Sequence, residues 1–189
     1  FLVGTVGSRS ADGNRWSVEG ATLLEDIIVE TAAGDLSAER LDSARILPHE
    51  TRRFYAGGSV VTVAHLEGLA GPNTHGILIR VHSSPAGKVA MRLILPSGGA
   101  HASLRAEGHF IVCRRSDGRA IVLSAGSEGR ASGERVSVDA PGIARFLVLF
   151  LPRNADPMLA DSIAPELETL AAARESRMNR LMNTSYIRT

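Results

Sequence analysis

The chain has 189 residues, of which 44% are hydrophobic, and its 21 basic and 20 acidic residues leave a net charge of +1. This length and a mean hydropathy of +0.04 fit one globular domain with an ample core, and exclude a disordered chain. A near-neutral charge, 4% aromatic residues and no apolar run approaching the ~18 residues of a membrane span exclude nucleic acid and membrane as expected partners.

Up to residue 150 the sequence consists mostly of short apolar runs separated by Gly, Ser, Asp and Pro, a pattern typical of antiparallel β structure. Residues 21–31 fit a helix or a strand by periodicity, but their β-branched residues favour a strand. Residues 35–41 read as a loop or one helical turn, and Pro48 indicates an edge or a bulge. The strands predicted in this half are 1–3, 16–18, 21–31, 44–55, 59–66 and 76–82.

The second half gives the clearest strand signals. Residues 88–95 alternate between apolar and other side chains, whereas 143–151 are nearly all apolar and fit a strand that is covered on both faces. Asp117-Gly118 lies between the apolar runs 110–114 and 120–124, which predicts a hairpin, and a short strand is expected at 135–138. Ten or more short strands predict an all-β fold, a two-sheet antiparallel sandwich.

The segment 154–189 has the only long helical periodicity. Asp156 followed by Pro157 predicts an N-cap and a first helical residue, Pro165 predicts a kink or two successive helices, and Asn183 fits a C-terminal stop. The expected division is therefore a sandwich domain, 1–153, and a helical linker or tail, 154–189. One apolar stripe is predicted for the helix, formed by Leu159, Ile163, Leu167, Leu170, Met178 and Leu181.

Motifs that carry chemistry are missing from the sequence. The six histidines are scattered singly, without the ligand spacing of a metal site, and no glycine loop is followed by a Walker lysine or forms a G-x-S-x-G elbow. The single cysteine, Cys113, lies in an apolar strand and is interpreted as a buried structural thiol. We therefore predict no catalytic residue, no metal and no cofactor.

Three aromatic residues, Trp16, Tyr55 and Tyr186, could offer a sugar a broad ring with a polar edge. Of these, Trp16 and Tyr55 are the candidate carbohydrate-binding residues. The alternative for Trp16 is that it fills the end of the sandwich, because large aromatic side chains dominate core burial.

Three segments carry a resemblance to a known group of enzymes: WSVEG at 16–20, LPHET at 47–51, and RMNRLMNTSYIRT at 177–189. The chain resembles the N-terminal part of bacterial glycoside hydrolases of the six-hairpin class, the glucoamylase-like and amylo-α-1,6-glucosidase (glycogen-debranching-related) enzymes. The resemblance implies a galactose-mutarotase-like β-supersandwich, then a helical linker, then an (α/α)₆ barrel. The catalytic acid and base would belong to the barrel, so no catalytic residue is carried over to this chain.

The expected function is that of a non-catalytic N-terminal domain in an enzyme acting on α-glucans, with the (α/α)₆ catalytic domain of the same polypeptide as its partner. One alternative is a self-contained carbohydrate-binding module whose partner is an oligosaccharide. Another is a sugar mutarotase or epimerase, which needs a His and a Glu converging in a cleft; His65, His82 and His109 are its candidates.

Overall fold

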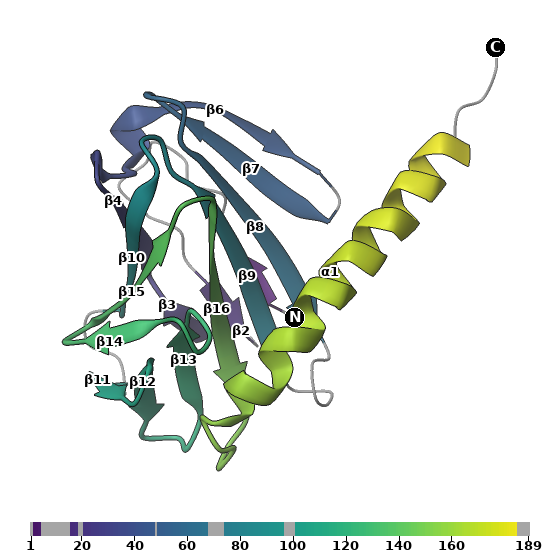
Figure 1. Cartoon of the computed structure of the whole chain (residues 1–189). Helices are drawn as coiled ribbons and strands as arrows, with labels where there is room; N and C mark the ends of the chain where they lie inside the picture. Colours follow the sequence, from purple (N-terminus) through teal and green to yellow (C-terminus); the bar gives the residue numbers. More distant parts are fainter. Residues whose placement is uncertain are drawn as a thin grey trace.

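The computed structural model describes residues 2–4, 16–18, 21–47, 49–67, 74–96 and 101–184. Its described strands form three hydrogen-bonded sheets with antiparallel pairing, and one long helix, α1 (Leu159–Thr184), follows them (Figure 1). The two larger sheets share a single apolar core. The prediction of an all-β, two-sheet antiparallel sandwich followed by a C-terminal helix is therefore confirmed.

The larger sheet has eight strands in the order β11-β12-β13-β16-β9-β8-β7-β6. In β16, Phe146, Val148 and Phe150 enter the core between the sheets. The intervening residues Leu147 and Leu149 belong to a second core beneath α1, so β16 is covered on both faces as predicted. The strands of this sheet are β6 (Leu41–Ile46), β7 (Glu50–Tyr55), β8 (Val60–Glu67), β9 (His75–His82), β11 (His101–Glu107), β12 (Phe110–Arg115), β13 (Ala120–Ser124) and β16 (Ile143–Leu151).

The second sheet has five strands in the order β14-β15-β10-β4-β5. In β10 the predicted alternation is present: Val89, Met91 and Leu93 are at most 2% exposed, and the residues between them face outward. The strands of this sheet are β4 (Asp26–Thr31), β5 (Gly34–Asp35), β10 (Gly87–Ile94), β14 (Arg130–Ser132) and β15 (Arg135–Ala140).

A small third sheet, β1 (Leu2–Gly4), β2 (Trp16–Val18) and β3 (Ala21–Leu24), adjoins the five-stranded one. The strand predicted at 21–31 is two strands, because the chain changes partner at Glu25: β3 pairs with β2, whereas β4 pairs with β10, and the Glu25 backbone N–H already donates to the carbonyl of Ile94 in β10 at 2.8 Å. A 3₁₀ turn, η1 (Ala38–Arg40), occupies the region predicted as a loop or one helical turn.

Several other local expectations can be compared with the structure. The hairpin at Asp117-Gly118 is confirmed, with φ of 81° at Gly118, a conformation that glycine adopts without strain. The strand predicted at 44–55 is a pair, β6 and β7, joined by residues 47–49. Strands β5, β11 and β14 were not predicted. The expectations for Phe1 and Pro48 lie outside the described residues.

Asp156 caps the turn that leads into α1, as predicted, but the helix itself begins at Leu159, two residues after the predicted start at Pro157. The Asp156 carboxylate accepts the N–H of Met158 at 2.9 Å, which satisfies a donor that the first turn leaves free. The helix then continues as a single element through Pro165 and ends at Thr184, one residue beyond the predicted stop. The predicted division into two helices is wrong, and Pro165 itself is exposed.

Among its described side chains, α1 packs on the sandwich through its first half, apart from Arg174, whose guanidinium donates to the backbone carbonyl of His65 in β8. Its buried residues are Ala160, Ile163, Leu167 and Ala171, whereas Leu170 and Leu181 of the predicted stripe are 45% and 49% exposed. Small alanines at the contact allow the helix to approach the sheet closely. From 172 to 181, which we call the distal segment, each residue is exposed or half-buried, and Figure 1 shows this part of α1 leading away from the sheets.

Candidate functional site

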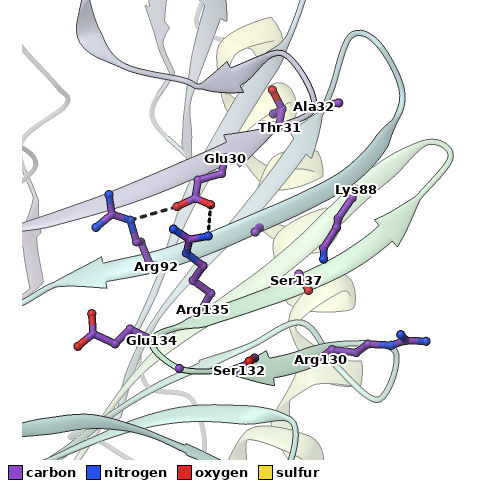
Figure 2. A pocket seen from close by; sticks show the side chains of 12 residues that line it. Glu30, Thr31, Ala32, Lys88, Arg92, Arg130, Ser132, Glu134, Arg135 and Ser137 are labelled. Atoms are coloured by element: carbon purple, nitrogen blue, oxygen red, sulfur yellow. Dashed lines mark hydrogen bonds and ion pairs between the residues drawn. The ribbon is translucent and has the colours of Figure 1, made fainter.

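The outer face of the five-stranded sheet carries a groove of about 710 Å³, which we call the charged groove (Figure 2). It lies over β4, β10, β15 and β14. Small side chains line its centre, and long charged side chains stand around them. The charged lining residues are Glu30, Lys88, Arg92, Arg130, Glu134 and Arg135.

The strand register explains why this face is hollow. Ala90 of β10 lies opposite Glu30 on one side and Ser137 on the other, and Ser137 in turn lies opposite Arg130. Directly opposed residues on antiparallel strands point to the same face of a sheet. The row therefore has two small residues between a glutamate and an arginine, which leaves space above its middle.

One wall of the groove is fixed by Glu30. Its carboxylate accepts the Nε–H of Arg92 at 3.1 Å and also contacts a terminal guanidinium nitrogen of Arg135 at 3.3 Å. The Glu30 side chain is 17% exposed, whereas that of Arg135 is 58% exposed, so the carboxylate is the better ordered partner. A single carboxylate on β4 thus orients two arginines, Arg92 of β10 and Arg135 of β15, which lie directly opposite each other in the register.

Two cations of the charged groove have no such partner. Within the described part of the chain, neither Lys88 nor Arg130 makes an ion pair or a side-chain hydrogen bond, and the same holds for the hydroxyls of Ser132 and Ser137. In Figure 2 the Lys88 side chain extends toward Ser137. The charged groove therefore offers four basic groups against two acidic ones, together with donors that can bind a ligand.

A second charged region lies on the outer face of the eight-stranded sheet, beyond the area that α1 covers. The carboxylate of Glu50 is nearly buried, with a side chain that is 3% exposed, and contacts the guanidinium groups of Arg52 and Arg80. We call the surrounding surface the arginine face. A single transverse row of the register contains Arg45, Arg52, Thr62, Arg80 and Arg145.

Apolar side chains accompany these arginines. Phe54 and Ile143 lie in the next row of the register and are 37% and 46% exposed. Glu50 balances part of the charge of Arg52 and Arg80, but the row contains four arginines. The arginine face, defined by the row above together with Phe54 and Ile143, therefore combines excess positive charge with exposed apolar area.

The two predicted carbohydrate-binding residues do not form a surface platform. Trp16 is 2% exposed and Tyr55 is 6% exposed, and both belong to the core between the sheets. The Trp16 ring packs at a tilt on His65, with centroids 4.7 Å apart. Stacking of a sugar needs an accessible ring face, which neither residue has; the alternative interpretation, Trp16 as a core residue, accounts for its position. Tyr186 lies outside the described residues.

The candidate histidines are separate from one another. His65 packs on Trp16 from the core-facing side of its strand, whereas His82 is exposed at the end of β9. His109 pairs with Asp161 of α1 at 2.8 Å and links the β11–β12 turn to the helix. No group of three or more His, Cys, Asp or Glu side chains suited to a metal ion occurs among the residues that the structure describes.

Cys113 is fully buried in the core between the sheets, as predicted. Burial raises the pKa of its thiol, and the nearby charge of Arg115 opposes the rise only partly. A thiol that resists ionisation is a poor nucleophile and a poor metal ligand. Its role is therefore to fill core volume.

Sequence reasoning found neither the charged groove nor the arginine face. The signal available was the alternation of 88–95, which places Lys88 and Arg92 on the outward face, whereas nothing in the sequence distinguishes Glu30 from the other carboxylates. The missing information was strand order, because Glu30, Lys88 and Arg135 come together only through the pairing β4-β10-β15.

No protein-family model and no curated protein matches this sequence. Among solved structures, one described as "Putative kojibiose phosphorylase from human microbiome" is similar, with a TM-score of 0.39 and 9% sequence identity. The similar region covers 84% of this chain and 26% of that protein, so the chain corresponds to about a quarter of its length. Within the described residues, no helix has the length and apolar character needed to cross a membrane.

Proposed function

We propose that this chain is a non-catalytic β-sandwich domain of an enzyme that acts on α-glucans, and that it packs against a helical catalytic domain of the same polypeptide. The contact surface in this proposal is the arginine face together with the distal segment of α1. The carbohydrate class comes from the sequence resemblance to the six-hairpin glycoside hydrolases. The choice of contact surface is supported by the burial and charge of the residues described above.

The observation that carries the proposal is the change along α1. Up to Ala171 its inward side chains are buried against the eight-stranded sheet, and from 172 to 181 none is buried, although Met178 and Leu181 are apolar. Ten helical residues extend about 15 Å. Arg174 still donates to the backbone carbonyl of His65, but a segment of that length whose apolar residues are not buried on its own sheet is typical of a connection that packs on another body.

The arginine face supports the same conclusion. Exposed Phe54 and Ile143 beside a row of arginines give a surface that is partly apolar and partly charged, which is the usual character of contacts between domains of one chain. Its excess of arginines over carboxylates favours a partner surface rich in Asp and Glu. Arginine is suited to such contacts because its guanidinium binds a carboxylate through two parallel hydrogen bonds.

The first test is enzymatic. The purified chain is incubated with maltooligosaccharides, with and without inorganic phosphate, and products are separated by chromatography. We expect no hydrolysis and no phosphorolysis. Turnover that co-purifies with the chain would refute a non-catalytic role.

The second test addresses the partner. The gene is read beyond the codon for Thr189, where we expect a helical repeat carrying two acidic residues suited to general acid and base catalysis. Hydrogen exchange of the longer polypeptide should then show protection in β7, in β16 and in the distal segment, relative to the 189-residue chain.

Matched charge reversals separate docking from general effects of charge. Arg145→Glu on the arginine face should weaken protection of the distal segment in the longer polypeptide, whereas Arg130→Glu on the opposite sheet should leave it unchanged. Equal effects of the two variants would contradict docking at this face. Protection that depends on protein concentration would instead show a second copy as the occupant and would also overturn the proposal.

A further inference from the structure

We propose that the charged groove binds an anionic saccharide, a sugar that bears carboxylate, sulfate or phosphate groups. The saccharide part of this inference rests on the proposed role in an enzyme acting on carbohydrates. The anionic part rests on the groove itself, which lies on the opposite sheet from the arginine face. The two proposals therefore use different surfaces and can fail separately.

The charge of the groove favours an anion. Four basic groups and two carboxylates line it, and one of the carboxylates, Glu30, is engaged by Arg92 and Arg135. Lys88 and Arg130 stand at the groove without a partner among the described residues. An ammonium and a guanidinium facing one hollow attract oxyanions, and charge-assisted hydrogen bonds are the strongest that such groups form.

The floor of the groove favours a ligand with many hydroxyls. Ser132 and Ser137 each offer a hydroxyl that has no side-chain hydrogen bond among the described residues, and Ala90 between the strands leaves room for close approach. A hydroxyl group both donates and accepts, so it can bind sugar hydroxyls as well as an oxyanion. The ammonium of Lys88 and the guanidinium of Arg130 would bind the acidic groups.

The lining residues also exclude other ligands. No aromatic or large aliphatic side chain lines the groove, so an apolar ligand or a stacked nucleobase has no platform there. A neutral sugar would likewise find no aromatic ring to stack on, and it has no acidic group for Lys88 and Arg130 to bind. A volume of about 710 Å³ lies within the range of small-molecule sites, and a groove this open gives affinity that falls as salt screens the charges.

The sequence allows a direct assay, because Lys88 is the only lysine in the chain. An amine-reactive ester at limiting concentration labels Lys88, and the modified peptide is quantified by mass spectrometry, with the α-amino group as internal reference. The ligands tested are trigalacturonate, glucose 6-phosphate, maltotriose and inorganic phosphate at equal ionic strength. We expect trigalacturonate or glucose 6-phosphate to slow Lys88 labelling about tenfold at saturation, and maltotriose to leave it unchanged.

Comparison of the four ligands identifies the source of the effect. Protection by trigalacturonate alone shows carboxylate recognition, and protection by glucose 6-phosphate alone shows phosphate recognition; either supports the proposal. Equal protection by maltotriose would contradict the requirement for an anion. Equal protection by inorganic phosphate would contradict the requirement for a sugar, and protection by none of the four would overturn the proposal entirely.

A pair of variants tests whether the effect arises in the groove. Arg130→Gln should raise the concentration needed for half-protection about tenfold, whereas Arg105→Gln, on an exposed edge strand of the other sheet, should leave it unchanged. Both positions are exposed, so both variants should unfold thermally like the wild type. Equal behaviour of the two variants would contradict binding in the groove. Failure of domain docking would leave this assay unaffected, since labelling is measured on the 189-residue chain.

Discussion

The two outer faces of the sandwich differ in what covers them. The outer face of the eight-stranded sheet is apolar where α1 lies on it, and there Leu147, Leu149 and Ile163 are at most 4% exposed. The outer face of the five-stranded sheet carries charged and small side chains and stays open as a groove. Both sheets pack on the same core with their inner faces, so the two outer faces differ only in whether another element covers them.

That difference can be read in two strands. β16 is apolar at successive positions, because both of its faces are covered, whereas β10 alternates because only one of its faces is. Specific ligand chemistry can develop only on an uncovered face, since a covered one contributes its side chains to packing. The following variants test this division, from the largest expected effect to the smallest.

Leu149→Ala should give the largest loss. Leu149 is fully buried between β16 and α1, so the truncation loses apolar burial and leaves a cavity, at a cost of about 3 kcal/mol of unfolding free energy. The matched change on the open face, Lys88→Ala, should stay within about 0.5 kcal/mol. Urea unfolding of both variants measures the difference. Similar losses would show that the two faces are not distinguished by covering.

Ile163→Ala sharpens the comparison within α1. Ile163 is 3% exposed against the sheet, and its truncation should cost about 2 kcal/mol. Leu181→Ala in the distal segment, where the side chain is 49% exposed, should change stability by less than about 0.5 kcal/mol. The measurement is again the urea midpoint. A cost for Leu181→Ala equal to that of Ile163→Ala would show that the distal segment packs on its own sheet.

The fold was largely predictable because local pattern and burial agree. The alternation in β10, the continuous apolar run of β16 and the turn at Asp117-Gly118 each gave the correct element. Strands β11 and β14 were missed because each contains polar or small residues without a clear period, and β14 lies at the edge of its sheet. Of the two alternatives predicted from Pro165, two successive helices is wrong, because a helix docked on a sheet can retain a proline that would interrupt it in isolation.

The candidate site was not predictable, since its parts are distant in sequence. Glu30 and Arg92 are 62 residues apart and meet only because β4 pairs with β10. The aromatic residues singled out as sugar platforms are in the core, because the apolar area that makes a ring a good platform also stabilises its burial. Composition alone therefore identified large rings and could not say on which side of a sheet they lie.

Glu30→Gln tests the wall of the open face. The substitution removes the charge that Arg92 and Arg135 share and should lower unfolding free energy by at most about 1 kcal/mol, because the ion pairs are partly exposed. Glu134→Gln, at an exposed position of the same groove, is the control and should have no measurable effect. The loss in Glu30→Gln should diminish in high salt. A loss independent of salt would indicate a packing role for Glu30 in place of an electrostatic one.

Asp117→Asn should have the smallest effect. Its pH dependence compares a charged turn of the eight-stranded sheet with the Glu30 ion pairs of the five-stranded sheet. Desolvation raises the pKa of Asp117, but hydrogen bonds from the Arg115 side chain and the Arg119 backbone N–H outweigh it, so the pKa lies below its usual value. A lowered pKa in the folded state means that the carboxylate stabilises the hairpin above the unfolded pKa of about 4, and that this contribution is lost as pH falls through the folded value. Wild type and Asp117→Asn should therefore differ in urea midpoint at pH 7 and converge at pH 2. A difference that persists at pH 2 would show that the turn depends on the shape of the Asp117 side chain and not on its charge.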